Sequence, residues 1–223
     1  MKIAVLLYGR INRYRELYQR FRVFFGNHDI DIFYSSDASP ETELNDFINI
    51  YRPIKVINDK IPLQPFFQKY TYEHTVNIDS MYCHFMNKQR VFSLLEEYCK
   101  DTSTHYDCVF STRLDIYYTC MLPKLTINNN TVYVPNNHSI PDINDHIAYG
   151  SYESMKTYMN IISNCDTLLL KYVNTLNPHL LTYYNLFSNN ISVELVSLNY
   201  HLVSESGDLK PKGWVTDRTL PLP

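Results

Sequence analysis

The chain has 223 residues, of which 45 % are hydrophobic, and its 20 Lys and Arg against 23 Asp and Glu give a formal net charge of -3. This composition is that of a globular protein of one or at most two domains, and it excludes wholesale disorder. It offers no global basic field that would hold a nucleic-acid backbone, so we expect no nucleic-acid partner.

Glycine is scarce, with only 5 in the chain, whereas tyrosine occupies 20 positions. No pair of glycines has the spacing of the phosphate-binding loops G-x-G-x-x-G or G-x-x-x-x-G-K-[ST]. Neither a P-loop NTPase nor a dinucleotide-binding dehydrogenase is therefore expected.

The five cysteines are odd in number and widely spaced, which fits neither a disulfide framework nor a zinc site. The opening apolar run is too short for a signal peptide, and no apolar stretch approaches the ~18 residues of a membrane span. We expect a cytoplasmic protein with reduced thiols and no membrane span.

The first sixty residues alternate between strand and helix patterns. The continuous apolar run 2–7 predicts a strand buried on both faces, and Asn12 begins a helical pattern that Gly26 stops. A strand over 29–34, a helix over 41–51 and a strand over 54–57 follow. This order is typical of an α/β sheet with right-handed crossovers.

The middle of the chain combines a long loop with a long helix. Residues 58–76 are rich in proline and aromatic residues without a clean period, which predicts a surface loop. Asp79 is expected to cap a helix from Ser80 to about Cys99. Of its two cations Lys88 and Arg90, at least one is expected to be only a surface charge, although either can reach a bound anion.

The second half predicts shorter strands joined by antiparallel hairpins. The strands are expected over 106–112, 116–120, 131–134, 147–148 and 191–200. Helices are expected over 152–163 and from Asn177 to Phe187, and an apolar run over 167–173 separates them. An extended tail is expected from Ser204 onward. The expected fold is a single α/β domain with a mixed, mostly parallel sheet flanked by helices.

Three predicted strands end in polar residues, at Tyr8-Gly9-Arg10, Ser35-Ser36-Asp37 and Arg113-Leu114-Asp115. In an open α/β sheet, ligands bind outside the carboxyl ends of the strands. An Asp at such an end can hold Mg²⁺ or Mn²⁺, which makes Asp115 the strongest candidate ligand. The alternative is that Asp115 only ends a strand and pairs with Arg113 or with a helix N-terminus.

Other polar residues allow two interpretations each. Asp145 or His146 can act as a general base, or Asp142 and Asp145 can cap a helix. Arg10 and Arg13 can hold a pyrophosphate at a helix N-terminus, or form a solvated helix face. The following histidines lack metal-binding spacing and are expected to be structural, with His201 kept as a candidate metal or phosphate contact: His84, His105, His138, His179 and His201.

Four segments together resemble small GT-A glycosyltransferases: 2–10, 31–36, 106–116 and 144–151, the last with Met155 and Tyr158 behind it. Within that group, they resemble the glycosyltransferase domain that chlorella-type large DNA viruses use on their capsid glycans. The resemblance runs from Met1 to about Val203. It implies a nucleotide-sugar donor, with UDP expected, a Mn²⁺ or Mg²⁺ ion on the diphosphate, and a glycan or glycoprotein acceptor.

The resemblance also implies roles for residues. It places Tyr8, Gly9, Arg10 and Asp37 on the donor, and Asp115 is the last residue of a D-x-D metal motif whose first carboxylate is replaced by Arg113. It maps Asp145 to the base that deprotonates the acceptor hydroxyl in an inverting enzyme. The full set of predicted donor-binding residues is Tyr8, Gly9, Arg10, Asp37, Asp79, Arg90 and Arg113.

We accordingly expect residues 1–115 to bind the nucleotide sugar, 116–203 to bind the acceptor, and 204–223 to form the tail. Because the metal motif is incomplete, a non-catalytic module that binds a nucleotide sugar or glycan is the alternative. A nucleotidyltransferase is a weaker one, since the chain lacks the paired carboxylates and the triphosphate loop such enzymes need.

Overall fold

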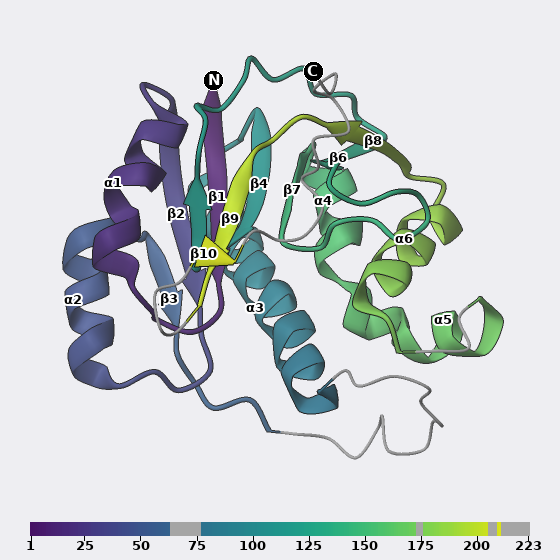
Figure 1. Cartoon of the computed structure of the whole chain (residues 1–223), viewed down its shortest axis with the longest axis horizontal. Helices are drawn as coiled ribbons and strands as arrows, with labels where there is room; N and C mark the ends of the chain where they lie inside the picture. The colour runs from purple at the N-terminus through teal and green to yellow at the C-terminus, as the bar shows by residue number, and fades with distance from the viewer. Residues whose placement is uncertain (63–76, 173–175, 205–208, 211–223) are drawn as a thin grey trace, which may run out of the picture.

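Seven strands form the central sheet, in the order β3-β2-β1-β4-β7-β6-β8 (Figure 1). The computed structural model describes residues 1–62, 77–172 and 176–204 and the backbone of 209–210. The strands are β1 (Lys2–Tyr8), β2 (Asp29–Ser35), β3 (Lys55–Ile57), β4 (Cys108–Arg113), β6 (Thr131–Pro135), β7 (Ile147–Gly150) and β8 (Ser192–Val196). The first four are parallel, whereas β7 runs antiparallel to both β4 and β6. The predicted mixed, mostly parallel sheet is confirmed.

Strand β1 is buried on both faces, which explains its unbroken apolar run. Ile3, Val5 and Leu7 pack with the helices α1 (Tyr14–Phe25) and α2 (Glu41–Tyr51). Ala4, Leu6 and Tyr8 face the opposite layer, which is built from α3 (Ile78–Thr102) and α4 (Tyr152–Met159). The sheet is therefore the middle of three layers.

A small second sheet packs on the α1 side of the molecule. It contains β5 (Ile116–Tyr118), β9 (Tyr200–Val203) and β10 (Leu209–Lys210), all antiparallel. The Tyr118 ring of β5 stacks on Phe24 of α1 with 3.9 Å between ring centroids. The single strand predicted over 191–200 is wrong, because the chain leaves the large sheet after β8 and enters the small sheet as β9. Both strands carry the same alternating pattern, so periodicity could not separate them.

The helices after β7 differ in part from the expectation. Helix α4 ends at Met159 rather than near residue 163, and a 3₁₀ turn over Ile161–Asn164 leads into α5 (Cys165–Lys171), which contains most of the apolar run predicted over 167–173. Helix α6 (Pro178–Ser188) begins as predicted, since the Asn177 side chain accepts hydrogen bonds from the amides of His179 and Leu180. Proline at its first position is compatible with this start.

The long helix α3 begins two residues earlier than predicted. Asn77, not Asp79, is its N-cap residue, and the Asn77 side chain accepts a hydrogen bond from the amide of Ser80 at 3.0 Å. Asp79 lies one position inside the first turn, where its charge complements the helix dipole. The cap prediction for Asp79 is therefore wrong.

Two predictions fall largely outside the described residues: the loop over 58–76 beyond residue 62, and the tail beyond Ser204 apart from β10. Within the described residues, no helix combines the length and apolar character needed to cross a bilayer. All five cysteines are free.

We predict that Asn77→Ala lowers the free energy of unfolding by about 1 kcal/mol, because it removes an N-cap acceptor. Asp79→Ala is the matched control and should cost less, since it removes only an exposed charge near the helix dipole. Urea unfolding followed by circular dichroism measures both. Equal losses in the two variants would contradict the assignment of Asn77 as the cap.

Candidate active site

The carboxyl ends of β1 and β4 and the start of β7 meet at one edge of the sheet. Tyr8 pairs in register with Arg113, and Thr112 pairs with Ile147. Strand β2 pairs with one side of β1 and β4 with the other, so the strand order reverses direction at β1. The edge between β1 and β4 is therefore a topological switch point of the sheet. Crevices at such points are the usual ligand sites of open α/β sheets.

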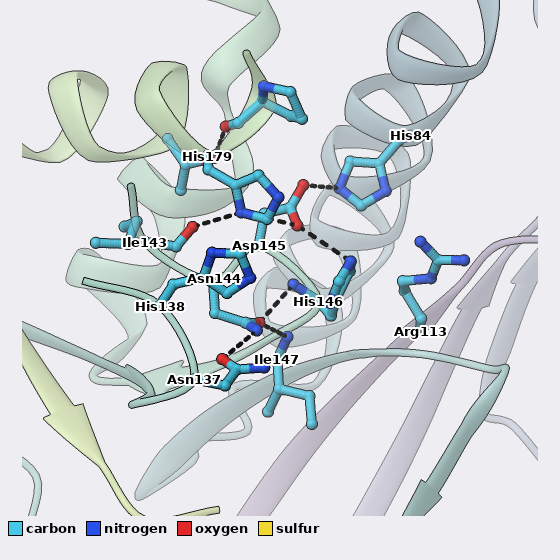
Figure 2. Close-up of polar contacts among 12 residues, drawn as sticks. His84, Arg113, Asn137, His138, Ile143, Asn144, Asp145, His146, Ile147 and His179 are labelled. Carbon is cyan, nitrogen blue, oxygen red and sulfur yellow. Dashed lines mark hydrogen bonds and ion pairs between the residues drawn. The ribbon is translucent and has the colours of Figure 1, made fainter. Parts of the chain in front are cut away.

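The carboxylate of Asp145 lies beside this edge, surrounded by three imidazoles (Figure 2). Its oxygens are 3.3 Å from Nε2 of His84, 3.4 Å from Nε2 of His146 and 3.6 Å from Nδ1 of His179. Asp145 is only 3 % exposed. His84 comes from α3 and His179 from the first turn of α6, so three distant segments converge on one carboxylate.

The loop that carries Asp145 is fixed by buried hydrogen bonds. Tyr8 donates its hydroxyl proton to the backbone carbonyl of Asp145 at 3.1 Å. The side-chain oxygen of Asn144 accepts from the amides of His146 and Ile147, and its nitrogen donates to the hydroxyl of Tyr200 at 2.6 Å. No helix begins at this loop, so the interpretation of Asp142 and Asp145 as helix caps is wrong.

The imidazoles determine the protonation of the site. Burial raises the pKa of Asp145, but the charges of His179 and His146 and the contact with His84 outweigh it, so this pKa lies well below its ordinary value. Burial lowers the pKa of His84 despite the nearby carboxylate. At neutral pH, Asp145 is therefore ionised while His84 is neutral and able to accept a proton.

Lys88 is fully buried, so of the two cations of α3 it is not the one that forms a surface charge. Its ammonium nitrogen lies 3.7 Å from the centre of the Tyr158 ring and has no hydrogen-bond partner among the described residues. Burial lowers its pKa to about 7, against the opposing effect of the Asp145 charge. The next cation, Arg90, instead donates to the backbone carbonyl of Asp59 at 2.7 Å.

Arg113 and Asp115, at the end of β4, form a bidentate ion pair. The Nε and Nη2 atoms of Arg113 lie 2.8 and 2.5 Å from the two carboxylate oxygens of Asp115. This pairing is the alternative raised by the sequence. Figure 2 places the Arg113 side chain on the same side of the sheet edge as His146 and His84.

The remaining predicted donor residues lie around the ends of β1 and β2. Gly9 has a φ of 107°, which favours glycine, and its carbonyl accepts from the hydroxyl of Tyr34 at 2.7 Å. Asp37 accepts from the amide of Ile61 at 2.7 Å and from the thiol of Cys83 at 3.7 Å. The charge of Arg10 also acts on Cys83, which places Arg10 near Asp37.

The structure divides the predicted residues into two groups. Tyr8 and Arg113 join Asp115 and Asp145 in one neighbourhood, since the charges of these three residues all act on the Tyr8 hydroxyl. Tyr8 itself is buried, with its ring against His84 at a centroid distance of 5.3 Å, so this ring is not an exposed stacking surface. The second group lies around Cys83, because the charges of Asp37, Asp79 and Arg10 all act on its thiol. Arg13, just before α1, forms an ion pair with Glu16.

Sequence reasoning missed His84, Lys88 and His179 as members of the site. No local spacing joins them, because they come from α3 and α6 and meet only through the fold. The one available signal was the helical period of α3, on which His84 and Lys88 are four residues apart and therefore share a face.

A second group of ligating side chains lies beside the first. Among the described residues, His138, Asp142 and His179 are the only group of at least three His, Cys, Asp or Glu whose ligand atoms all lie within 4.8 Å of one another. Asp115 is not a member. His201, the histidine kept as a candidate metal contact, is not a member either.

Comparisons with known proteins show a shared fold. No family model and no curated protein matches this chain. The apo form of the glycosyltransferase GlyE of Streptococcus pneumoniae TIGR4 is 12 % identical over 87 % of this chain and 45 % of that one, with a TM-score of 0.49. A second GlyE structure is 13 % identical with the same coverage and a TM-score of 0.47.

An active-site mutant of LgtC is 9 % identical over 85 % of this chain and 72 % of that one, with a TM-score of 0.54. The α/β fold of this chain matches that of LgtC. The chain spans less than half the length of GlyE. At this level of identity the comparison establishes the fold alone.

We predict a pH dependence of stability from Lys88. Its folded pKa of about 7 lies below its unfolded value, so the unfolded state binds more protons between these two pKa values. Stability should therefore rise with pH from about 7 to about 10.5, at no more than about 1.4 kcal/mol per pH unit.

Lys88→Met should remove this rise, which urea unfolding at a series of pH values measures. Lys100→Met, on an exposed position at the end of the same helix, is the matched control and should keep it. A wild-type slope that survives in Lys88→Met would contradict the assignment.

Proposed function

We propose that this chain is a glycosyltransferase that moves a sugar from a nucleotide-sugar donor, expected to carry UDP, to a hydroxyl of a glycan. The observation that carries the proposal is the location of the polar cluster. Arg113, Asp145 and His84 gather at the switch point of a sheet whose fold matches that of glycosyltransferase neighbours. The order of the four sequence segments that resemble GT-A glycosyltransferases supports it independently.

On the donor side, side chains rather than glycine amides must bind the diphosphate. Arg113 presents a planar guanidinium at the end of β4, and Arg10 follows the end of β1. Guanidinium groups suit phosphate oxygens because they form paired, charge-assisted hydrogen bonds. We assign Arg113 and Arg10 to the diphosphate, and Gly9 and Asp37 to the nucleoside end of the donor.

The resemblance implies a Mn²⁺ or Mg²⁺ ion held by Asp115, which the side chains as they stand do not fit. These cations take several oxygen ligands, whereas Asp115 is a single carboxylate already paired with Arg113. We therefore assign no step to a metal at Asp115. A Mn²⁺ requirement for donor binding would restore the assignment.

On the acceptor side, we assign proton transfer to Asp145 acting with His84. Asp145 is buried and strongly acidic, which makes its carboxylate a weak base, but it can hold His84 in position and stabilise the imidazolium that forms. His84 is neutral and partly exposed, and is therefore the better proton acceptor. This division of roles follows the logic of carboxylate–imidazole pairs in other enzymes.

In an inverting reaction, the acceptor oxygen attacks the anomeric carbon from the side opposite the diphosphate. The acceptor oxygen forms a bond to the anomeric carbon as the bond from that carbon to the diphosphate oxygen breaks. The hydroxyl proton passes to His84, and the nucleoside diphosphate leaves with the bonding electrons. Arg113 stabilises the negative charge that develops on the leaving diphosphate.

Two finer assignments belong to the same proposal. By its resemblance to the chlorella-virus family, the acceptor is a glycan of a viral capsid glycoprotein and the chain works in the host cytoplasm.

The alternative function, a non-catalytic module that binds a nucleotide sugar or a glycan, is favoured by the incomplete metal motif. Donor binding without transfer or hydrolysis across an acceptor panel would select that alternative.

The first test is a thermal-shift screen of nucleotide sugars, with and without Mn²⁺. A donor that binds the native state raises its stability by RT ln(1 + [L]/Kd). We predict that Arg113→Lys weakens binding of the selected donor by about tenfold or more, because it removes the guanidinium fork. Arg22→Lys, on the exposed face of α1, is the control and should leave the affinity unchanged.

The second test separates proton transfer from donor binding. Asp145→Asn and His84→Gln should each lower kcat by about a hundredfold or more with little change in donor Kd. The double variant should lose little beyond the larger single loss, since the two residues act as a unit. Asp29→Asn, at the opposite end of β2, should retain wild-type kcat. If the kcat of Asp145→Asn stays within about threefold of the wild-type value, Asp145 does not take part in proton transfer, and Asp142 or His146 becomes the candidate for its role.

A further inference from the structure

Beside the Asp145 cluster lies a second group of side chains, which shares His179 with that cluster and whose other two members the proposed reaction does not use. It consists of His138 and Asp142, from the loop between β6 and β7, and His179 near the start of α6. Their ligand atoms lie within 4.8 Å of one another, and the rings of His138 and His179 stack with 4.5 Å between centroids. Figure 2 shows these two imidazoles on the side of Asp145 away from Arg113.

His179 is held in an orientation that frees one nitrogen for a ligand. Its Nδ1 lies 2.7 Å from the backbone carbonyl of Ile143 and 3.6 Å from Oδ1 of Asp145. A carbonyl oxygen can only accept, so Nδ1 carries a proton, and Nε2 is the nitrogen left to bind a metal ion once its own proton is released. Imidazoles that bind metals commonly donate their other N–H to a carbonyl or a carboxylate in this way.

Asp142 is oriented as well. The side-chain amide of Asn177 lies 3.4 Å from Oδ1 of Asp142, while Oδ2 lies 3.2 Å from Nδ1 of His138. The Asp142 side chain is 47 % exposed, and those of His138 and His179 are 24 % and 17 % exposed. Asp142 and His179 are thus oriented by hydrogen bonds to Asn177 and Ile143, while all three side chains remain partly exposed to solvent.

We propose that His138, Asp142 and His179 form a binding site for a divalent transition-metal ion of the Zn²⁺ or Co²⁺ class. Two imidazoles and one carboxylate are borderline-soft and hard ligands that suit these ions, whereas Mg²⁺ and Ca²⁺ take oxygen ligands alone. Ligand atoms of a tetrahedral zinc site lie about 3.3 Å apart, as follows from its bond lengths. The ligand atoms of this partly exposed group lie within 4.8 Å of one another, so we expect side-chain rotation to bring them to this shorter separation when an ion binds.

This metal site is distinct from the ion that the family resemblance places at Asp115. It leaves one coordination position to water or to a substrate group, as three-ligand zinc sites do. The proposal does not depend on glycosyl transfer, since it rests on the ligand set alone and its test uses no activity.

The test is a titration of the tag-free chain with Co²⁺ under reducing conditions, followed by visible absorption and by calorimetry. We expect one ion per chain and the absorption of a four- or five-coordinate Co²⁺ with nitrogen and oxygen ligands. Zn²⁺ should displace it, and Mg²⁺ at the same concentration should not.

His138→Ala, Asp142→Asn and His179→Gln should each weaken Co²⁺ binding by at least about tenfold. His105→Ala, which removes an exposed histidine outside the group, is the control and should bind as the wild type. Asp142 lies at the surface, so its variant remains informative even if a histidine variant is poorly folded. Absence of a one-to-one complex, a sulfur-to-Co²⁺ charge-transfer band, or undiminished binding by Asp142→Asn would overturn the proposal.

Discussion

The buried carboxylate of Asp145 is the constraint on which the arrangement of the site depends. An ionised carboxylate removed from water is costly unless charged or hydrogen-bonding partners surround it. Here the partners are imidazoles of His84, His146 and His179, all within 3.6 Å of its oxygens. Helix α3, helix α6 and the loop before β7 must therefore keep their mutual positions for the charge to be tolerated.

Hydrogen bonds from two other parts of the fold fix the backbone around Asp145. Tyr8 links the end of β1 to the Asp145 carbonyl, and Asn144 links the loop to Tyr200 of the small sheet. These contacts join both sheets to the site. The contact between Asp145 and His84, to which the proposed function assigns proton transfer, thus also holds the layers together, so we expect substitutions here to act on stability as well as on activity.

The scarcity of glycine limits how a phosphate can be bound at the sheet edge. A phosphate cannot be wrapped by backbone amides where no glycine-rich loop exists, so the proposed function assigns the donor diphosphate to side chains. Arg113 stands at the end of β4, where the resemblance would place a first acidic ligand, and it already neutralises Asp115. In the proposed function, the Arg113 guanidinium takes the place beside the diphosphate that a metal ion has in the related motif.

Much of the fold could be predicted because its elements carry local signals. The doubly buried β1, the helix that stops at Gly26, and the Asn177-Pro178 start of α6 all follow from periodicity and capping chemistry. The errors arose where two local patterns compete. Asn77 and Asp79 are both good caps, and the run through β8 and β9 alternates continuously although the two strands belong to different sheets.

The sequence by itself determined the fold class, the edge of the sheet where chemistry collects, and the candidates Arg113, Asp115 and Asp145. Only the tertiary structure decided which partners these residues have. It paired Asp115 with Arg113, enclosed Asp145 in imidazoles and buried Lys88 against Tyr158. The reason is physical: strand and helix patterns are read over a few neighbouring residues, whereas burial and pairing depend on groups far apart in the chain, such as Tyr8 and the carbonyl of Asp145, which are 137 positions apart.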